Sequence, residues 1–237
     1  MGLLDTILGR SKPVRANLDA LFALPAAAVT LQVSAGLVAT GRAGVCFKPP
    51  AGQPFAQMQA ELEQLLATPD EAGTAPSPAP ASGSAPASGE AAPTVRHVGD
   101  KFGYRWILVE AAALDDLVTR VHMVHSSLQD AGWSTQLLCS VFGFAPGPPG
   151  TAADLDAGAP GDATADAGAA VVSIDAVTKP IYIVYLAKQG TFYPFAPSGS
   201  EQRDTELELR LRSVIDDDLP VESDLSRWFP IWDLPVA

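Results

Sequence analysis

Apolar side chains recur at helical spacing in several stretches of the chain. Between residues 114 and 131, Leu117, Val121, Val124 and Leu128 share one face, which predicts an amphipathic helix that buries this face. The same pattern predicts a helix at 204–215. Further helices are predicted at 1–8, at 17–24, at 26–35 between Pro25 and Gly36, and at 55–66.

Shorter apolar runs that are bounded by Gly, Pro or Asp predict β-strands. Residues 181–186 are almost continuously apolar, as expected for a strand inside a sheet. Residues 37–48 are compatible with one strand or with a hairpin around Gly41–Gly44. Other strands are predicted at 95–98 and 104–110, which form a hairpin, and at 136–144 and 191–195.

The connections between these elements are of the hairpin type, so the strands are expected to run antiparallel. The predicted fold class is α+β, with an antiparallel sheet of about five to seven strands packed with four to six helices. Residues 69–93 and 146–170 consist almost entirely of small residues and Pro. We predict that both are disordered insertions, because they bury too little apolar area to offset their ordering entropy.

The predicted organisation is one α+β domain over residues 16–237, interrupted by these two linkers and preceded by a distinct segment at 1–15. In that segment Leu3, Leu4, Ile7 and Leu8 share one helical face, and basic residues follow, including Arg10 and Lys12. A two-turn helix is unstable alone in water, so this face is expected to bury itself. Docking onto the protein's own core, contact with an anionic membrane and contact with a partner all remain open.

Charge narrows the classes of partner. The formal net charge is −12, and all of it comes from residues 106–237, which carry seven Lys or Arg against nineteen Asp or Glu. An acidic half of this kind repels phosphate backbones and disfavours binding to nucleic acid. The chain contains no run of 18 consecutive apolar residues and no signal-peptide pattern, so we predict a cytoplasmic protein without a membrane-spanning helix.

Candidate groups for catalysis are few. His122 and His125 have the spacing of a helical metal pair, but solvent-facing or packed histidines are the more common explanation. Cys46 and Cys139 lie in apolar strand patterns and are expected to be buried thiols. The acidic run Asp216–Asp218 is more typical of solvated surface than of a cation site. The sequence therefore predicts no catalytic residue, no metal and no cofactor.

An aromatic segment lies close to the C-terminus, with Arg227, Trp228, Phe229 and Trp232 within six positions. Trp and Arg are common in binding hot spots, so this segment is a candidate partner surface. Terminal aromatic segments more often close a hydrophobic core, and we favour that interpretation here.

Several separated blocks of the sequence resemble the PspAB family of actinobacteria, whose members are associated with PspA. The blocks are MGLLDTILGR at 1–10, LDALFALP at 18–25, GVCFKP at 44–49, QLLCS at 136–140, GTFYPFAP at 190–197, DLPVE at 218–222 and DLSRWFP at 224–230. No catalytic residue accompanies the resemblance. It covers nearly the whole chain apart from the two linkers.

The resemblance implies a non-enzymatic accessory protein of the PspA response to membrane stress. The expected partner is PspA or another protein of the Psp system, with possible contact to the inner face of the cell membrane through the N-terminus. The motif residues that it singles out as structural or partner-facing are Gly190, Thr191, Phe192, Tyr193, Pro194 and Phe195, together with the aromatic segment. Two alternatives are a chaperone-like binding module and a metal-dependent hydrolase that uses His122 and His125.

Overall fold

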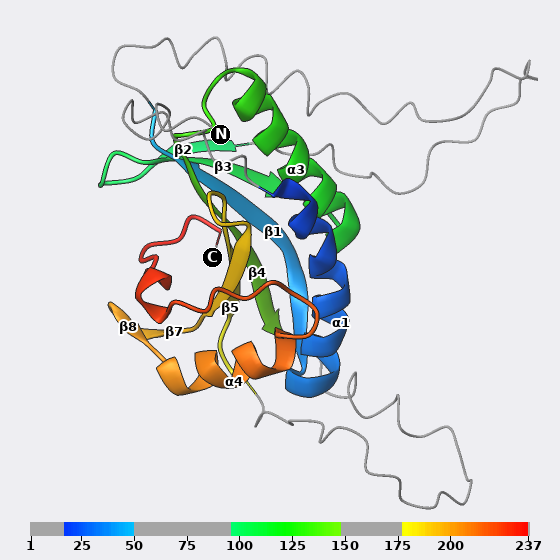
Figure 1. Ribbon diagram of the computed structural model, residues 1–237. Coiled ribbons are helices and arrows are strands. Elements are labelled where there is room, and N and C mark those ends of the chain that lie inside the picture. Colours follow the sequence, from blue (N-terminus) through cyan, green and yellow to red (C-terminus); the bar gives the residue numbers. More distant parts are fainter. Residues whose placement is uncertain (1–16, 50–95, 148–176, 237) are drawn as a thin grey trace, which may run out of the picture.

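The computed structural model describes residues 17–49, 96–147 and 177–236 (Figure 1). The helices predicted at 1–8 and 55–66 lie outside the described residues. So do the segment 1–15, the linker 69–93 and most of the linker 146–170.

Six strands form one antiparallel sheet. Their spatial order is β2 (Arg96–Gly99), β3 (Arg105–Glu110), β1 (Leu37–Phe47), β4 (Leu137–Pro146), β5 (Ile181–Leu186) and β6 (Thr191–Phe195). Every neighbouring pair runs antiparallel. The predicted antiparallel sheet of five to seven strands is thus confirmed, and strands from all three blocks between the linkers pair within it. A separate ribbon follows, made of β7 (Pro197–Gly199) and β8 (Gln202–Arg203).

Three α-helices occur in the described residues, fewer than the four to six expected. They are α1 (Leu24–Ala35), α3 (Leu114–Asp130) and α4 (Thr205–Ile215). The stretch predicted as a helix at 17–24 is the 3-10 helix η1 (Leu18–Ala23), and a second one, η2, spans Leu225–Arg227. Gly36 ends α1 in the left-handed conformation, with φ of 64°, and the carboxylate of Asp204 caps α4 by accepting from the Leu207 amide.

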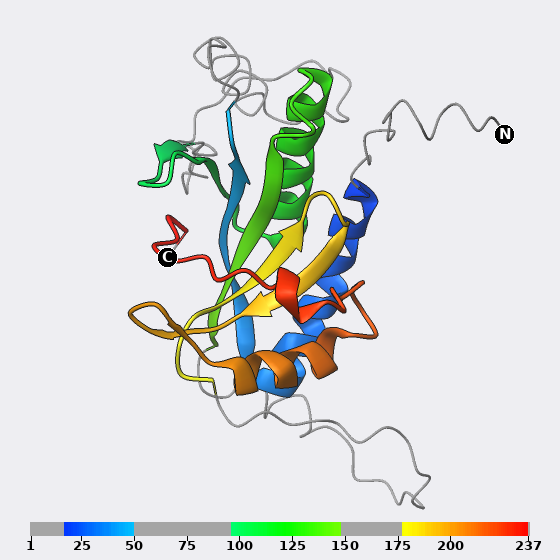
Figure 2. The same cartoon turned by 60° about the vertical axis from the view of Figure 1, so that its left-hand side comes forward.

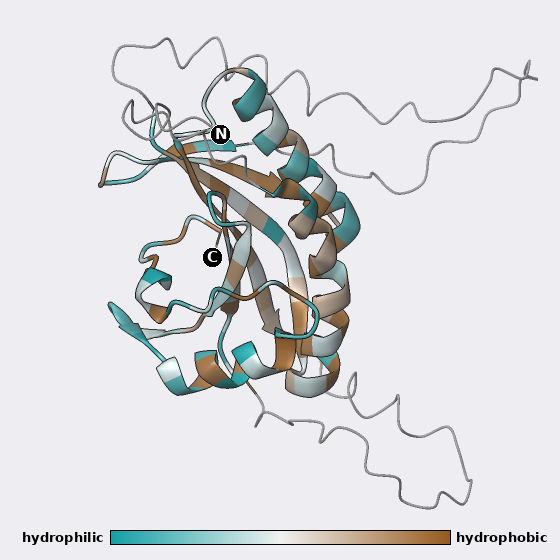
Figure 3. Cartoon of the chain, in the orientation of Figure 1, coloured by the Kyte–Doolittle hydropathy of each residue, from teal (hydrophilic) through white to brown (hydrophobic). Residues whose placement is uncertain are grey.

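The helices and the C-terminal tail lie on opposite sides of the sheet (Figures 1 and 2). On one side, α1 and α3 bury Leu31, Val121 and Leu128 against the sheet, and α4 adds Leu211. On the other side, the tail covers a second, smaller core that includes Val184. Figure 3 shows the corresponding concentration of hydrophobic residues along the strands.

The segment Leu18–Ala35 meets a simple criterion for a membrane-spanning helix, although none was predicted from the sequence. It is long and apolar enough to cross a membrane by length and composition alone. In the fold its inward side chains, such as Leu21, Leu24 and Leu31, are completely buried in the first core. Core helices of globular proteins pass the same test.

The structure also differs from the sequence predictions at β1 and at the end of β4. Residues 37–47 form one continuous strand, so the hairpin interpretation around Gly41–Gly44 is wrong. Gly41 instead accommodates an irregularity in the pairing of β1 with β4, between Ala39 and Ala43. The second linker was predicted to begin at residue 146, yet Pro146 ends β4 opposite Leu37, and the Gly147 amide donates to Gly36 O at 2.8 Å.

Gly41 gives a prediction for stability. Its φ is 73°, and a Cβ there would lie 2.5 Å from the carbonyl oxygen of Ala111, whose amide donates to Gly41 O. We expect Gly41→Ala to lower the free energy of unfolding by about 2–4 kcal/mol, from left-handed strain and the backbone clash together.

Gly103→Ala is the matched control, because Gly103 has φ of 83° and nothing within 4 Å of the added carbon. Strain alone should cost about 1 kcal/mol there. Chemical denaturation measures both variants, and equal losses would show that the contact with Ala111 is unimportant.

Candidate partner-binding surface

The motif at 190–197 builds a closed sheet edge. The outward-facing backbone of Phe192 is used by the tail, since its amide donates to Pro220 O at 2.9 Å and its carbonyl accepts from the Glu222 amide at 2.7 Å. Pro194, the next outward position, has no amide hydrogen to offer. The Ala196 amide donates to Glu208 Oε1 at 2.9 Å. These residues leave β6 no row of free donors, which protects the edge from pairing with another strand.

Gly190 lets the turn before β6 approach the start of η1. Its φ is 71°, and a Cβ there would lie 2.9 Å from Asn17 Cβ. The hydroxyl of Tyr185 donates to Asn17 O at 2.9 Å, which ties β5 to the same point. The glycine of the motif therefore serves packing.

The aromatic tail packs onto the side chains that β6 presents to the second core. The Trp228 ring stacks on Tyr193 with centroids 5.7 Å apart, and Trp232 meets Phe195 edge-on at 5.4 Å. The Tyr193 hydroxyl donates to Phe229 O at 2.8 Å, and burial raises the Tyr193 pKa, which keeps the hydroxyl protonated. Trp228 is buried, so the core-closing role favoured from the sequence is confirmed for this residue.

A buried carboxylate joins the tail to α4. Glu208 is fully buried and forms an ion pair with Arg203, with Nη2 2.5 Å from Oε2, while Arg203 Nε donates to the same oxygen at 2.8 Å. Arg203 Nη1 also donates to Trp228 O at 2.6 Å. Both partners are needed, because an unpaired carboxylate at this depth would cost several kcal/mol.

Glu222 is a second buried carboxylate, at the base of the tail. It accepts from Thr191 Oγ1 at 2.9 Å and from the Asp224 amide at 3.0 Å, and Arg227 Nη1 lies 3.7 Å from its Oε2. Its backbone carbonyl accepts from Trp228 Nε1 at 3.0 Å. The burial of both glutamates and their pairing with arginines could not be predicted from the sequence. A charged residue among other charged residues gives no sign that its side chain is buried.

This anchoring leaves a small apolar surface exposed on the tail. Phe229 is 60% exposed although its backbone carbonyl is held by Tyr193, and Leu225 is also exposed. The half-exposed guanidinium of Arg227 lies 3.4 Å from Asp224 Oδ2 through its Nε. We call Leu225, Arg227 and Phe229 the tail surface. An aromatic and an arginine on an immobilised backbone are typical of binding hot spots.

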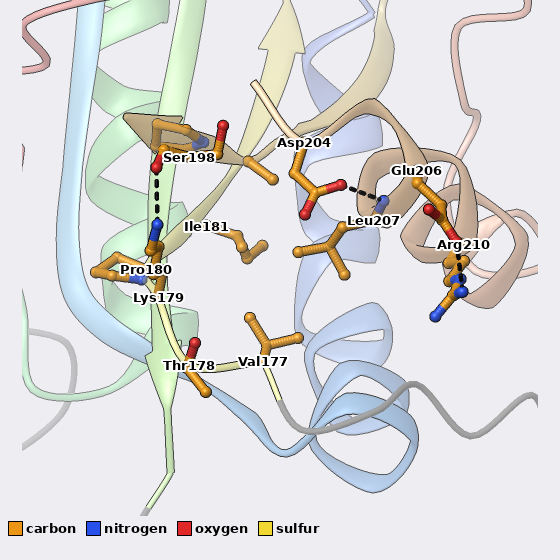
Figure 4. A pocket seen from close by; sticks show the side chains of 12 residues that line it. Val177, Thr178, Lys179, Pro180, Ile181, Ser198, Asp204, Glu206, Leu207 and Arg210 are labelled. Atoms are coloured by element: carbon orange, nitrogen blue, oxygen red, sulfur yellow. Dashed lines mark hydrogen bonds and ion pairs between the residues drawn. The ribbon is translucent and has the colours of Figure 1, made fainter. Parts of the chain in front are cut away.

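A pocket in the described part of the fold offers little for chemistry. It has a volume of about 440 Å³ and lies between the start of β5 and α4 (Figure 4). Its polar side chains already pair locally: Lys179 Nζ donates to Ser198 O at 2.7 Å, and Arg210 forms an ion pair with Glu206. Val177, Ile181 and Leu207 supply the apolar part of the lining.

The two histidines of the metal hypothesis contact different partners. His125 is fully buried and shares a hydrogen bond of 2.5 Å with Ser140 Oγ through Nε2. His122 packs its ring on Phe22 instead, with centroids 5.1 Å apart. Among the described residues no three His, Cys, Asp or Glu side chains are grouped to hold a metal ion. From the acidic run, Asp218 Oδ2 accepts from Thr30 Oγ1 at 2.5 Å and joins α4 to α1.

Cys46 and Cys139 face each other across β1 and β4, as free and buried thiols. The hydrogen bond with Cys139 and burial both raise the Cys46 pKa, so this thiol is a poor nucleophile. The N-terminal residues predicted to contact a membrane or partner, Leu3 to Lys12, lie outside the described part of the chain.

The buried histidine predicts how stability depends on pH. Burial, with a smaller effect of His122, lowers the His125 pKa to about 3, from 6.5 in the unfolded chain. Below pH 6.5 the unfolded state therefore binds a proton that the native state does not. We expect this to remove roughly 3 kcal/mol of stability between pH 7 and pH 4, at about 1.4 kcal/mol per pH unit.

The measurement is the free energy of unfolding against pH for the wild type and for His125→Gln, which cannot titrate. The two curves should converge as the pH falls. Parallel curves would contradict the assignment of this titration to His125.

Comparison with known proteins gives one family. The family model for PspA associated protein B, PspAB, matches residues 1–236. Searches of curated proteins and of solved structures give no significant match. The family's description indicates an association with PspA, in agreement with the resemblance of the sequence blocks. On the strength of a match over almost its full length, this chain belongs to the PspAB family.

Proposed function

We propose that this protein is a non-enzymatic accessory of the PspA response to membrane stress, which acts by binding PspA or a companion protein in the cytoplasm. The observation that carries the proposal is the match of the family model over residues 1–236. The way the polar core groups are used supports the non-enzymatic part. His125 bonds Ser140, and Glu208 and Glu222 are paired with arginines of the fold itself.

The tail surface is the proposed contact site for the partner. Phe229 and Leu225 are exposed on a backbone that Tyr193 and Trp228 hold in place, so little entropy is lost when a partner covers them. The tail surface belongs to residues 106–237, which carry the whole net charge of −12. A basic patch on the partner would suit them.

Replacing Phe229 tests this site. We expect Phe229→Ser to weaken binding to purified PspA by at least about ten-fold, which corresponds to about 1.4 kcal/mol, with unchanged folding because the side chain is 60% exposed. Isothermal titration calorimetry gives the dissociation constant.

Phe102→Ser is the matched control. Phe102 is 61% exposed and lies in the turn between β2 and β3, outside the tail surface, although Lys101 beside it forms an ion pair with Asp233 further along the tail. It should leave the affinity unchanged. Equal loss in both variants would indicate nonspecific hydrophobic contact, and no binding of the wild type to PspA would refute the proposed partner.

The N-terminal segment is the proposed contact with the inner face of the membrane. Leu3, Leu4, Ile7 and Leu8 would enter the lipid surface, and Arg10 and Lys12 would each contribute about 1 kcal/mol with anionic headgroups.

Deleting residues 1–7 should abolish co-sedimentation with phosphatidylglycerol vesicles. The variant Arg10→Gln/Lys12→Gln should weaken it by at least ten-fold, whereas vesicle binding that survives the deletion would exclude this segment as the anchor.

A further inference from the structure

An apolar stripe runs along the side of η1 and α1 that faces away from the core. It consists of Phe22, Ala26, Val29 and Val33, and we call it the outer seam. All four are exposed, with exposed fractions of 50%, 62% and 49% for Phe22, Val29 and Val33. Their spacing of four, three and four residues is the spacing of a helix that packs against another helix.

The opposite side of α1 packs against the rest of the fold, so the outer seam is not needed to hold this helix in place. Leu24, Leu31 and Ala35 are buried against the sheet and α3. Residues 24–35 include no charged side chain. The Phe22 ring touches His122 of α3, and it is still half exposed. An apolar ridge of this length is unusual on a solvated surface.

Acidic groups lie on one flank of the seam. Thr30, next to the seam on α1, donates to the carboxylate of Asp218, and the exposed Asp216 and Asp217 precede it at the end of α4. Both cartoon views show the segment that follows α4 running beside α1 (Figures 1 and 2). Asp19 adds an exposed carboxylate in η1. The surface that covers the seam should therefore be apolar with positive charge at its border.

The chain carries such a segment directly before η1. The first eight residues contain the apolar set Leu3, Leu4, Ile7 and Leu8, and the next eight contain Arg10, Lys12 and Arg15. As a helix the first eight would be about 12 Å long, and the seam from Phe22 to Val33 is roughly 17 Å long at the rises of 3-10 and α-helices. Eight linking residues span up to about 26 Å, ample for the chain to turn back from Asn17.

We propose that the apolar side chains of residues 1–8 dock on the outer seam, with the basic residues of the linker beside Asp19 and Asp216–Asp218. The contact is an intramolecular latch. The latch does not rest on the proposed function, because the seam and the segment belong to the same chain.

Disulfide trapping in the full-length chain tests the latch. Leu4→Cys is combined with Val29→Cys, and oxidised glutathione accepts the two electrons and two protons that the thiols lose. Cys46 and Cys139 stay in place because both are buried. We expect a cross-linked monomer to form at least ten-fold faster than in Leu4→Cys/Phe102→Cys, since Phe102 is equally exposed and distant from the seam.

Neighbouring charge substitutions separate docking from random collision. Ile7→Asp puts a charge on the apolar face and should reduce the rate of cross-linking at least ten-fold. Thr6→Asp adds the same charge on the polar face and should leave the rate unchanged. A covalent dimer as the main product would show that a second copy covers the seam. That result, no cross-link, or equal effects of the two aspartates would each overturn the latch.

Discussion

The ion pair between Arg203 and Glu208 is the contact on which the acidic half of the fold depends. A carboxylate without solvent exposure is tolerable only if charge and hydrogen bonds replace its hydration. Here the replacements are the amide of Ala196 after β6 and the guanidinium of Arg203 on β8, and this guanidinium also donates to the carbonyl of Trp228. One buried charge thus fixes the mutual positions of the sheet edge, α4 and the tail.

The C-terminal tail completes the second core and also carries the surface proposed for partner binding. It lies across the second core as a strap, held by ring stacking on Tyr193 and by the backbone hydrogen bonds of Phe192. Neither core includes the side chain of Phe229. The helical side has a comparable division, because α1 buries one apolar face and exposes another. The surfaces proposed for binding are in both cases the outer faces of elements whose inner faces build the fold.

Periodic segments were predictable from the sequence, and exceptions to periodicity were not. The helices 114–131 and 204–215 were found because their buried side chains recur at regular spacing. The hairpin ending at Glu110 was found because two short runs flank Gly and Asp residues that favour a turn. At Gly41 the sequence could not distinguish a hairpin turn from a single strand, because a pairing irregularity and a turn both need a left-handed residue. The burial of Glu208 was invisible, since its partner is fixed only by tertiary contacts. The motif around Tyr193 and the aromatic tail were singled out from the sequence, but their mutual contact required the structure.

The termination of β6 by Phe192, Pro194 and Ala196 has a consequence for assembly. A sheet that offers no backbone on this side cannot recruit a neighbour by continuing its ladder of hydrogen bonds. Any association there has to be mediated by side chains. Backbone pairing is indifferent to sequence, whereas side-chain contacts discriminate between partners. A protein built in this way can have its affinity and selectivity retuned by single substitutions, without opening a route to indiscriminate polymerisation.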